Sequence, residues 1–131
     1  INAAPFAHWR ETYKNTDIGN DFMSRFGCYC LIGANAPFYS KKMHAFVVYM
    51  PQELFYPWHH HPGEEMYLTI AGEAEFMKDK EENEFLQSGG VSEHKSNQPH
   101  AMKTHTNPVM AYVIWRNKFN TPPVWTDSLN N

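Results

Sequence analysis

Two histidines and a glutamate lie close together near the middle of the sequence, within the segment 56–72, YPWHHHPGEEMYLTIAG. His59 and His61 are separated by one residue, so they project from the same face of an extended strand. The following Pro62-Gly63 pair predicts a turn, and Glu65 opens a second run, EMYLTI, with the alternation and β-branching of a strand. A β-hairpin of this kind would bring two imidazoles and a carboxylate around one point, and these donors suit a divalent transition metal.

Tyr67 follows Glu65 by two residues and therefore shares its face of the predicted strand, which puts the phenol next to the metal. The alternative for Tyr67 is a buried core aromatic with a satisfied hydroxyl. Two neighbours compete for the ligand roles, because His60 belongs to the same run of three histidines and Glu64 precedes Glu65. Their positions in the sequence do not exclude His60 or Glu64 as metal ligands.

The spacing of these residues resembles the first motif of the cupin superfamily, which reads H-x-H, three residues, Glu, six residues and Gly. The sequence matches this motif at every defining position from His59 to Gly72, where the strand is expected to end. The resemblance implies an all-β fold, a single cupin β-barrel (a double-stranded β-helix or jelly roll). Many short strands with turn signals at close intervals favour the same class of sandwich or barrel.

A fourth metal ligand is expected beyond the Gly89-Gly90 turn, and His100, in the segment NQPHAMKT, is the preferred candidate. The second cupin motif reads G-x5-P-x-G-x2-H, and with His100 in register Gly89 takes its first position. Lys95 and Asn97 replace the proline and the glycine of that motif. The alternatives to His100 are three further histidines, each expected to be a surface or packing residue: His44, His94 and His105.

The rest of the chain divides into an N-terminal arm with a short helix, residues 1–26, and the barrel, residues 27–131. Asp17 is expected to cap the helix, which would run to about Arg25 with Phe22 and Phe26 on one side and stop at Gly27. Five further strands are predicted from apolar runs and alternation: 28–32, 44–50, 73–78, 84–86 and 109–116.

Composition and charge limit the possible partners. The 131 residues suit one domain, and 42% hydrophobic and 15% aromatic content with 9 prolines indicates a globular β-rich protein. A net charge of −3 without a basic stripe argues against nucleic acid, and no apolar run approaches the length that spans a membrane. Cys28 and Cys30 are too close for an easy disulfide and are expected as small buried thiols in a cytoplasmic protein.

Several segments together resemble a narrower group, the cupin-type dimethylsulfoniopropionate lyases. They are YP-x-HHHP-x-EE-x-Y, QPHA, the pair Trp115-Arg116 and the upstream run DFMSRFG, so the resemblance extends from about Trp9 to Arg116. The reaction it implies is a β-elimination that cleaves a small zwitterion, a sulfonium carboxylate, into dimethyl sulfide and acrylate. It also implies one divalent transition-metal ion, and iron, manganese, zinc, nickel and cobalt are all compatible with these donors.

The family resemblance assigns roles by position. It implies that His59 or His61, with Glu65 and His100, binds the metal, and His61 is the more certain of the two histidines. Tyr67 becomes the candidate base and an occasional metal ligand, with Tyr56 as the second catalytic candidate. Substrate-binding aromatics are expected from the resemblance and from the attraction of onium cations to aromatic faces: Tyr56, Trp115 and Tyr49.

Tyr56 has the opposite parity to His59 and reaches the same cavity only if Pro57 breaks the regularity of the strand. Two other functions stay open at this point. Three histidines with one carboxylate could hold iron in a dioxygenase, and a cupin barrel could bind a small ligand without catalysis. A homodimer is a further expectation.

Overall fold

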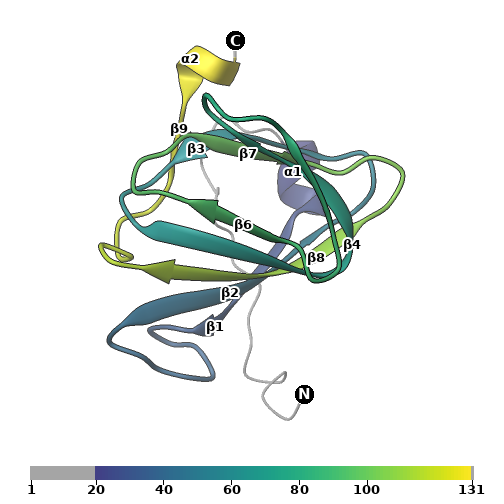
Figure 1. The fold of residues 1–131 in the computed structure, drawn as a ribbon. Helices are drawn as coiled ribbons and strands as arrows, with labels where there is room; N and C mark the ends of the chain where they lie inside the picture. The colour runs from purple at the N-terminus through teal and green to yellow at the C-terminus, as the bar shows by residue number, and fades with distance from the viewer. Residues whose placement is uncertain (1–19, 131) are drawn as a thin grey trace.

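Alternating apolar and polar residues fold into a structure whose regular elements are mainly strands, with two short helices (Figure 1). The computed structural model describes residues 20–130, so the expected arm and the helix cap at Asp17 lie outside the described residues. In chain order the described elements are α1 (Asn20–Arg25), β1 (Gly27–Ile32), β2 (Met43–Met50), β3 (Phe55–His60), β4 (Glu64–Lys78), β5 (Glu84–Gln87), β6 (Val91–His94), β7 (His100–Lys103), β8 (Val109–Arg116), β9 (Val124–Trp125) and α2 (Asp127–Asn130).

All five of the further strands predicted from the sequence are present. β8 coincides with the predicted segment 109–116, and β1 and β2 each begin one residue before the predicted strand. The predicted pairing of the segments 73–78 and 84–86 is confirmed, because the second half of β4 pairs with β5. Three elements are absent from the prediction, and each has four residues or fewer: β6, β9 and α2.

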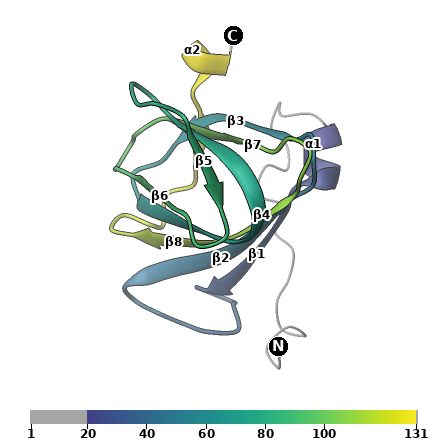
Figure 2. The same ribbon diagram turned by 45° about the vertical axis from the view of Figure 1, so that its right-hand side comes forward.

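The barrel is organised around β4, because this strand contributes to both halves of the sheet. Its first half pairs with β6 and β8, and its second half pairs with β5 and β7. The strand order β1-β2-β8-β4-β7-β3-β9 therefore curls around one interior, as two views show (Figures 1 and 2). The predicted all-β barrel is confirmed.

Gly72 lies where β4 passes from one set of partners to the other, and the strand bends there instead of ending as expected. Its φ of 75° lies in the left-handed region that residues with a Cβ rarely adopt. A Cβ at this position would be 1.8 Å from the carbonyl oxygen of Pro108, so no side chain fits. Glycine therefore allows one continuous strand to serve both halves of the barrel.

The turn at Pro62-Gly63 does not close the expected β-hairpin. β3 and β4 follow each other in the chain but do not pair, because β7 lies between them in the sheet order. The loop between β6 and β7 holds this turn: the Asn97 amide donates to the His61 carbonyl (2.8 Å), and the Ser96 hydroxyl donates to the Pro62 carbonyl (2.7 Å). The two strands therefore bring their side chains into the interior from opposite sides.

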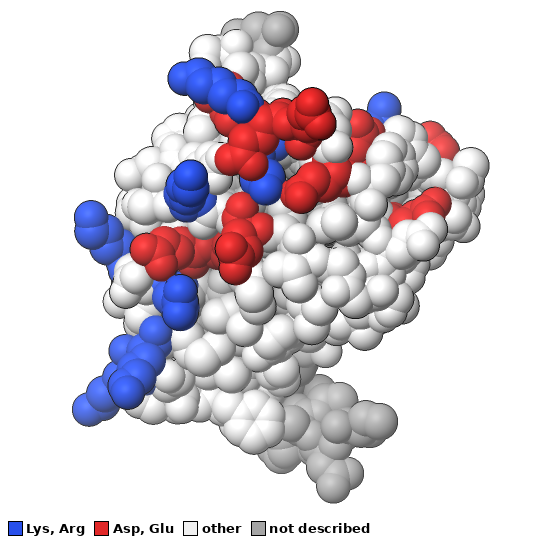
Figure 3. Space-filling view, in the orientation of Figure 1, with Lys and Arg blue, Asp and Glu red and all other residues white. Residues whose placement is uncertain are grey.

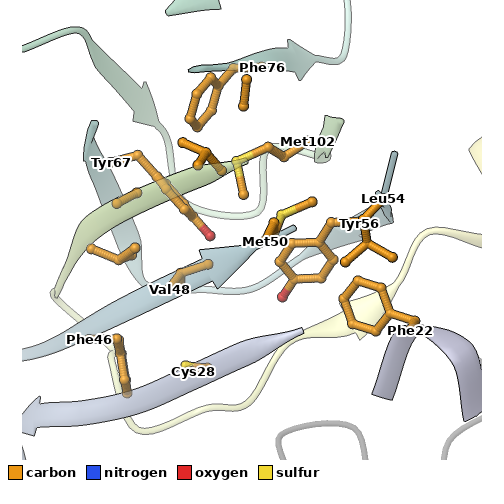
Figure 4. Packing of buried hydrophobic residues seen from close by; sticks show 14 residues of the cluster. Phe22, Cys28, Phe46, Val48, Met50, Leu54, Tyr56, Tyr67, Phe76 and Met102 are labelled. Carbon is orange, nitrogen blue, oxygen red and sulfur yellow. The ribbon is translucent and has the colours of Figure 1, made fainter. Parts of the chain in front are cut away.

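The hydrophobic core lies between the strands, around side chains such as Val48 and Phe76 (Figure 4). α1 packs against it through Phe22, which is 5% exposed and stacks on Phe26 with ring centroids 4.8 Å apart. The Phe22 ring also lies 5.3 Å from that of Tyr56 on β3. The predicted apolar side of the helix is therefore confirmed for Phe22 and Phe26, and it anchors the strand that carries the first histidines.

Three expectations outside the site also have an outcome. Cys28 is buried and Cys30 is half-buried, and no disulfide joins them. Within residues 20–130, no helix has the length and apolar character needed to cross a membrane. On the face seen in Figure 3, acidic and basic side chains lie side by side across the upper part, and basic side chains continue along the lower left edge.

Candidate metal centre

Three buried histidines present the same ring nitrogen to the interior of the barrel. In each ring Nδ1 lies against a backbone carbonyl two residues away, at 2.7 Å (His59 and Pro57), 3.0 Å (His61 and Gly63) and 2.8 Å (His100 and Gln98). A carbonyl oxygen only accepts, so Nδ1 carries the hydrogen in all three rings and donates it. Each Nε2 therefore keeps a lone pair, which is the tautomer that a metal ligand needs.

These nitrogens fit a metal ion. Ligand atoms of His59, His61 and His100 lie within 4.8 Å of one another. Nε2 of His61 and Nε2 of His100 are buried and make no hydrogen bond, which is costly for a polar atom without another partner. Burial, followed by the proximity of His100, lowers the pKa of His59 well below 6.5, so this ring is neutral at pH 7. Neutral imidazoles with converging lone pairs are what a transition metal requires.

Glu65 adds a carboxylate to this group. Its Oε1 lies 2.6 Å from Nδ1 of His94 and 3.0 Å from Nε2 of His100, and its Oε2 accepts a hydrogen bond from Nε1 of Trp115. Burial alone would raise the pKa of Glu65, but His100 and the surrounding hydrogen bonds together hold the pKa well below 4.5. The carboxylate is therefore ionised at pH 7, and all four predicted ligands lie in one buried group.

His94 is the member of the site that the sequence prediction missed. A surface or packing residue is expected there, whereas the side chain is 4% exposed and lies directly across from Glu65 in the β4–β6 pair. In β6 the polar residues Ser92 and His94 are buried, whereas Val91 and Glu93 are exposed. The apolar valine therefore faces outward, which reverses the usual pattern of a strand. This inverted pattern is the signal that could have found it, because polar residues face inward only where the interior is a polar site.

The competing residues lie outside the group. His60 places its Nδ1 at 2.7 Å from a threonine hydroxyl of the C-terminal segment, and Glu64 accepts from an asparagine at the surface. His105 pairs with Glu75 at 2.9 Å near the surface, as expected of a residue without a ligand role. His44 lies on the wall of a neighbouring cavity. It is not part of the two groups in the described chain that could hold a metal, which share His100: His59, His61 and His100, and Glu65, His94 and His100.

A cavity of about 160 Å³ opens beside Glu65. Its wall is rich in aromatic rings and includes three of the predicted residues, Tyr56, Tyr67 and Trp115. Figure 4 shows the hydroxyl ends of both tyrosines directed toward the region of Val48 and Cys28, which also line the cavity. The remaining wall is formed by Phe26, His44, Phe46, Val113 and residues 119–123.

Tyr56 reaches the cavity because β3 is irregular at Pro57, as the sequence predicts. The register of the β3–β7 pair shifts between Tyr56 and His59, and the Tyr56 ring stacks on His59 with centroids 4.2 Å apart. The prediction for Tyr49 is wrong. Val48 points inward on β2, so its neighbour Tyr49 points outward and is 38% exposed, away from the cavity wall.

Tyr67 lies on the same face of β4 as Glu65, as predicted, and its ring centroid is 5.6 Å from that of His94. Burial, followed by Glu65 and then by Tyr56 and Cys28, raises the pKa of Tyr67 well above 10.0. The phenol is therefore protonated at pH 7 in the metal-free protein. Positive charge beside it would move the pKa in the opposite direction.

Trp115 has contacts that the sequence does not predict. Besides lining the cavity, its indole stacks on the His61 ring with centroids 4.0 Å apart and planes inclined by 23°. Its Nε1 donates to Glu65. Trp115 therefore touches two of the four predicted ligands, and it lines the same cavity as Glu65.

Comparison with known proteins agrees with this arrangement. Residues 2–111 match the family model of dimethylsulfoniopropionate lyases. The chain belongs to the dimethylsulfoniopropionate lyase family. This member of the lyase family is 48% identical over 126 residues to the dimethylsulfoniopropionate lyase DddQ of Ruegeria pomeroyi, an alignment that covers 96% of this chain and 63% of DddQ. The chain therefore spans less than two thirds of the length of that relative.

Solved structures of lyases and of other cupins share the fold. The crystal structure of DddQ from Ruegeria pomeroyi matches with a TM-score of 0.91 over 96% of this chain and 64% of the other. A chain from the crystal structures of the DMSP lyases RdDddP and RnDddQII is 34% identical, with a TM-score of 0.87 over 95% of this lyase-family chain and 64% of the other. A cupin-like protein of Thermotoga maritima is 16% identical and matches with a TM-score of 0.63. The match covers 78% of this chain and 79% of the Thermotoga protein. The predicted cupin barrel is confirmed, and it encloses a His/Glu group able to hold a metal.

Proposed function

We propose that this chain carries the active site of a metal-dependent carbon–sulfur lyase that cleaves dimethylsulfoniopropionate into dimethyl sulfide and acrylate. One observation carries the proposal: a buried three-histidine and one-glutamate group lies beside an aromatic cavity into which two tyrosine hydroxyls point. Membership of the lyase family and the identity to DddQ support it.

His61, Glu65 and His100 are the proposed ligands of one divalent transition-metal ion, with His59 as the fourth. Iron, manganese, zinc, nickel and cobalt all suit this set of nitrogen and oxygen donors. A cation bound there would stabilise negative charge that develops beside the substrate carboxylate, and it would favour the phenolate of a neighbouring tyrosine.

The two poles of the substrate find different surroundings in this site. The carboxylate belongs on the side of the proposed ligands, where a bound cation would offset the negative charges of the substrate carboxylate and of the ionised Glu65. The sulfonium belongs in the aromatic part of the cavity, where Tyr56 and Trp115 present their rings. Each aromatic face contributes about 0.5–2 kcal/mol toward a desolvated onium cation, so no acidic side chain is needed at this pole.

Tyr67 is the proposed base, because it shares a strand face with Glu65 and lines the cavity. Its phenolate oxygen would take a proton from the carbon next to the substrate carboxylate and leave the electron pair of that C–H bond on the carbon. The electron pair of that C–H bond would form the double bond of acrylate, while the C–S bond breaks and its electron pair leaves with sulfur as neutral dimethyl sulfide. Tyr56, whose hydroxyl points the same way, is the second candidate.

The proposal is tested by incubating the purified, metal-loaded protein with dimethylsulfoniopropionate. Headspace analysis should detect dimethyl sulfide, and NMR of the solution should show acrylate in equal amount. Oxygen consumption without dimethyl sulfide would contradict the lyase and favour a dioxygenase. Binding of the substrate without any product would favour a non-catalytic binding protein.

Three further expectations stay predictions alongside the lyase activity. They are the division into residues 1–26 and 27–131, the homodimer and the cytoplasmic location. Size-exclusion chromatography with light scattering would test the homodimer directly, and a mass of one chain would contradict it.

A further inference from the structure

His94 differs from the three histidines with a free Nε2, because both of its ring nitrogens have partners. Its Nδ1 lies 2.6 Å from Oε1 of Glu65, and its Nε2 lies 3.2 Å from Oγ of Ser92. A carboxylate oxygen only accepts, so Nδ1 of His94 carries a hydrogen and donates it to Glu65. A nitrogen that carries a hydrogen cannot donate a lone pair to a metal. His94 therefore supports a ligand through Nδ1, while Nε2, which keeps the lone pair of this tautomer, is occupied by the Ser92 hydroxyl.

Glu65 is held by donors on both sides of its strand. His94 on β6 and Trp115 on β8 are the two direct cross-strand partners of Glu65 on β4. The first donates to Oε1 and the second to Oε2. Hydrogen bonds to an ionised acceptor are shorter and stronger than neutral ones, so this pair of donors fixes both the rotamer and the plane of the carboxylate.

His94 also contacts a second proposed ligand. Its ring stacks on that of His100, with centroids 4.0 Å apart and planes inclined by 22°. The Nε2 side of the His94 ring contacts the buried Ser92. The Ser92 hydroxyl also lies 3.4 Å from Oε2 of Glu84. Glu84 pairs with Lys78 at 3.1 Å, so the chain of contacts behind His94 continues to the outer wall of the barrel.

We propose that His94 is a positioning residue of the metal centre. Its Nδ1–H holds Glu65, and its ring face holds His100, so that both ligands are preset for the cation before it binds. This inference rests on the proposed metal centre but not on the identity of the substrate. Removal of such a supporting contact typically weakens metal binding about 10- to 100-fold.

Two substitutions separate the hydrogen bond from the ring contact. His94→Asn keeps an N–H near the position of Nδ1 but loses the ring, whereas His94→Phe keeps the ring and loses both nitrogens. His105→Phe is a matched control, because it removes a His–Glu contact of the same kind at Glu75, outside the site. Cobalt(II) is the probe: its affinity is measured by competition with a chelator, and its visible absorption at full occupancy reports the ligand geometry.

We expect His94→Phe to bind cobalt(II) about 10- to 100-fold more weakly than the wild type, with an altered spectrum. His94→Asn should stay within about threefold, and His105→Phe should bind like the wild type. If His94→Phe does not fold, His94→Gln takes its place, because the longer amide reaches toward Ser92 and leaves Glu65 without this donor.

Three results would overturn the inference. Wild-type affinity and an unchanged spectrum in His94→Phe would mean that His94 is only a packing residue. An equally severe loss in His94→Asn and His94→Phe would mean that the Nδ1–H donor, which asparagine keeps, does not preset Glu65. A wild-type protein that does not bind cobalt(II) would remove the proposed metal centre, and the inference with it.

Discussion

Replacing Tyr67 with phenylalanine removes one oxygen atom from the proposed site and keeps the ring. In the described part of the chain the hydroxyl has no hydrogen-bond partner, so its loss breaks no buried bond. The ring keeps its contact with Phe76, at a centroid distance of 5.6 Å. We therefore expect the free energy of unfolding and the metal content to change little, by less than about 1 kcal/mol for the former.

The effect on turnover should be much larger. General bases contribute about 10²- to 10⁴-fold in rate, which corresponds to about 3–5 kcal/mol of the activation barrier. We expect kcat of Tyr67→Phe to fall in this range while KM changes little, because the proposed ligands and the aromatic wall remain. The assay follows dimethyl sulfide release together with exchange of the substrate's α-hydrogen in deuterated solvent, and both should fall together.

Tyr56→Phe is the comparison variant. The Tyr56 ring stacks on His59 and lines the cavity, so loss of its hydroxyl should raise KM more than it lowers kcat. Wild-type turnover in Tyr67→Phe, with unchanged metal content, would refute the assignment of the base. Tyr56 would then be the next candidate.

The other predictions concern the metal, the bend and acid stability. His61→Ala and Glu65→Ala should abolish bound metal and activity, as elemental analysis and the dimethyl sulfide assay would show, and full metal occupancy in both would contradict the ligand assignment. Gly72→Ala should lower the free energy of unfolding in urea by at least about 2 kcal/mol, whereas Gly89→Ala, with a φ of 89° but nothing within 4 Å of its Cβ, should cost only about 1 kcal/mol. In the metal-free protein, burial is the main cause that lowers the pKa of His94 from 6.5 to about 4. Since the unfolded chain binds more protons between these values, stability should rise with pH from 4 to 6.5 by about 3 kcal/mol, and urea titrations of the wild type and His94→Asn should show a smaller rise in the variant.

Local patterns, together with the resemblance to the two cupin motifs, were sufficient to predict which side chains meet in the buried His/Glu group. Alternation along a strand places His59 with His61 and Glu65 with Tyr67, and these relations depend only on neighbours in the chain. The irregularity at Pro57 is local too. The predicted position of Tyr49 failed because no local signal shows which face of a fully apolar strand points into the cavity, and β2 is buried on both faces along most of its length.

Relations between distant segments could not be predicted in the same way. The expected hairpin at Pro62-Gly63 fails because β7, about forty residues further on, lies between the two strands, and sequence proximity says nothing about such an intervening partner. His94 was missed for a similar reason, since its contact with Glu65 depends on the register of a four-residue strand. The bend at Gly72 depends on the close approach of Pro108.

The most direct test of the lyase assignment is a metal titration of activity. The purified protein is stripped of metal with a chelator, and dimethyl sulfide release is measured as one divalent metal is added back in steps. The proposed centre predicts that activity rises in proportion to bound metal and stops rising at one ion per chain, while Glu65→Ala stays inactive throughout. Full activity in the stripped protein, or activity that ignores bound metal and survives in Glu65→Ala, would contradict a metal-dependent lyase at this site.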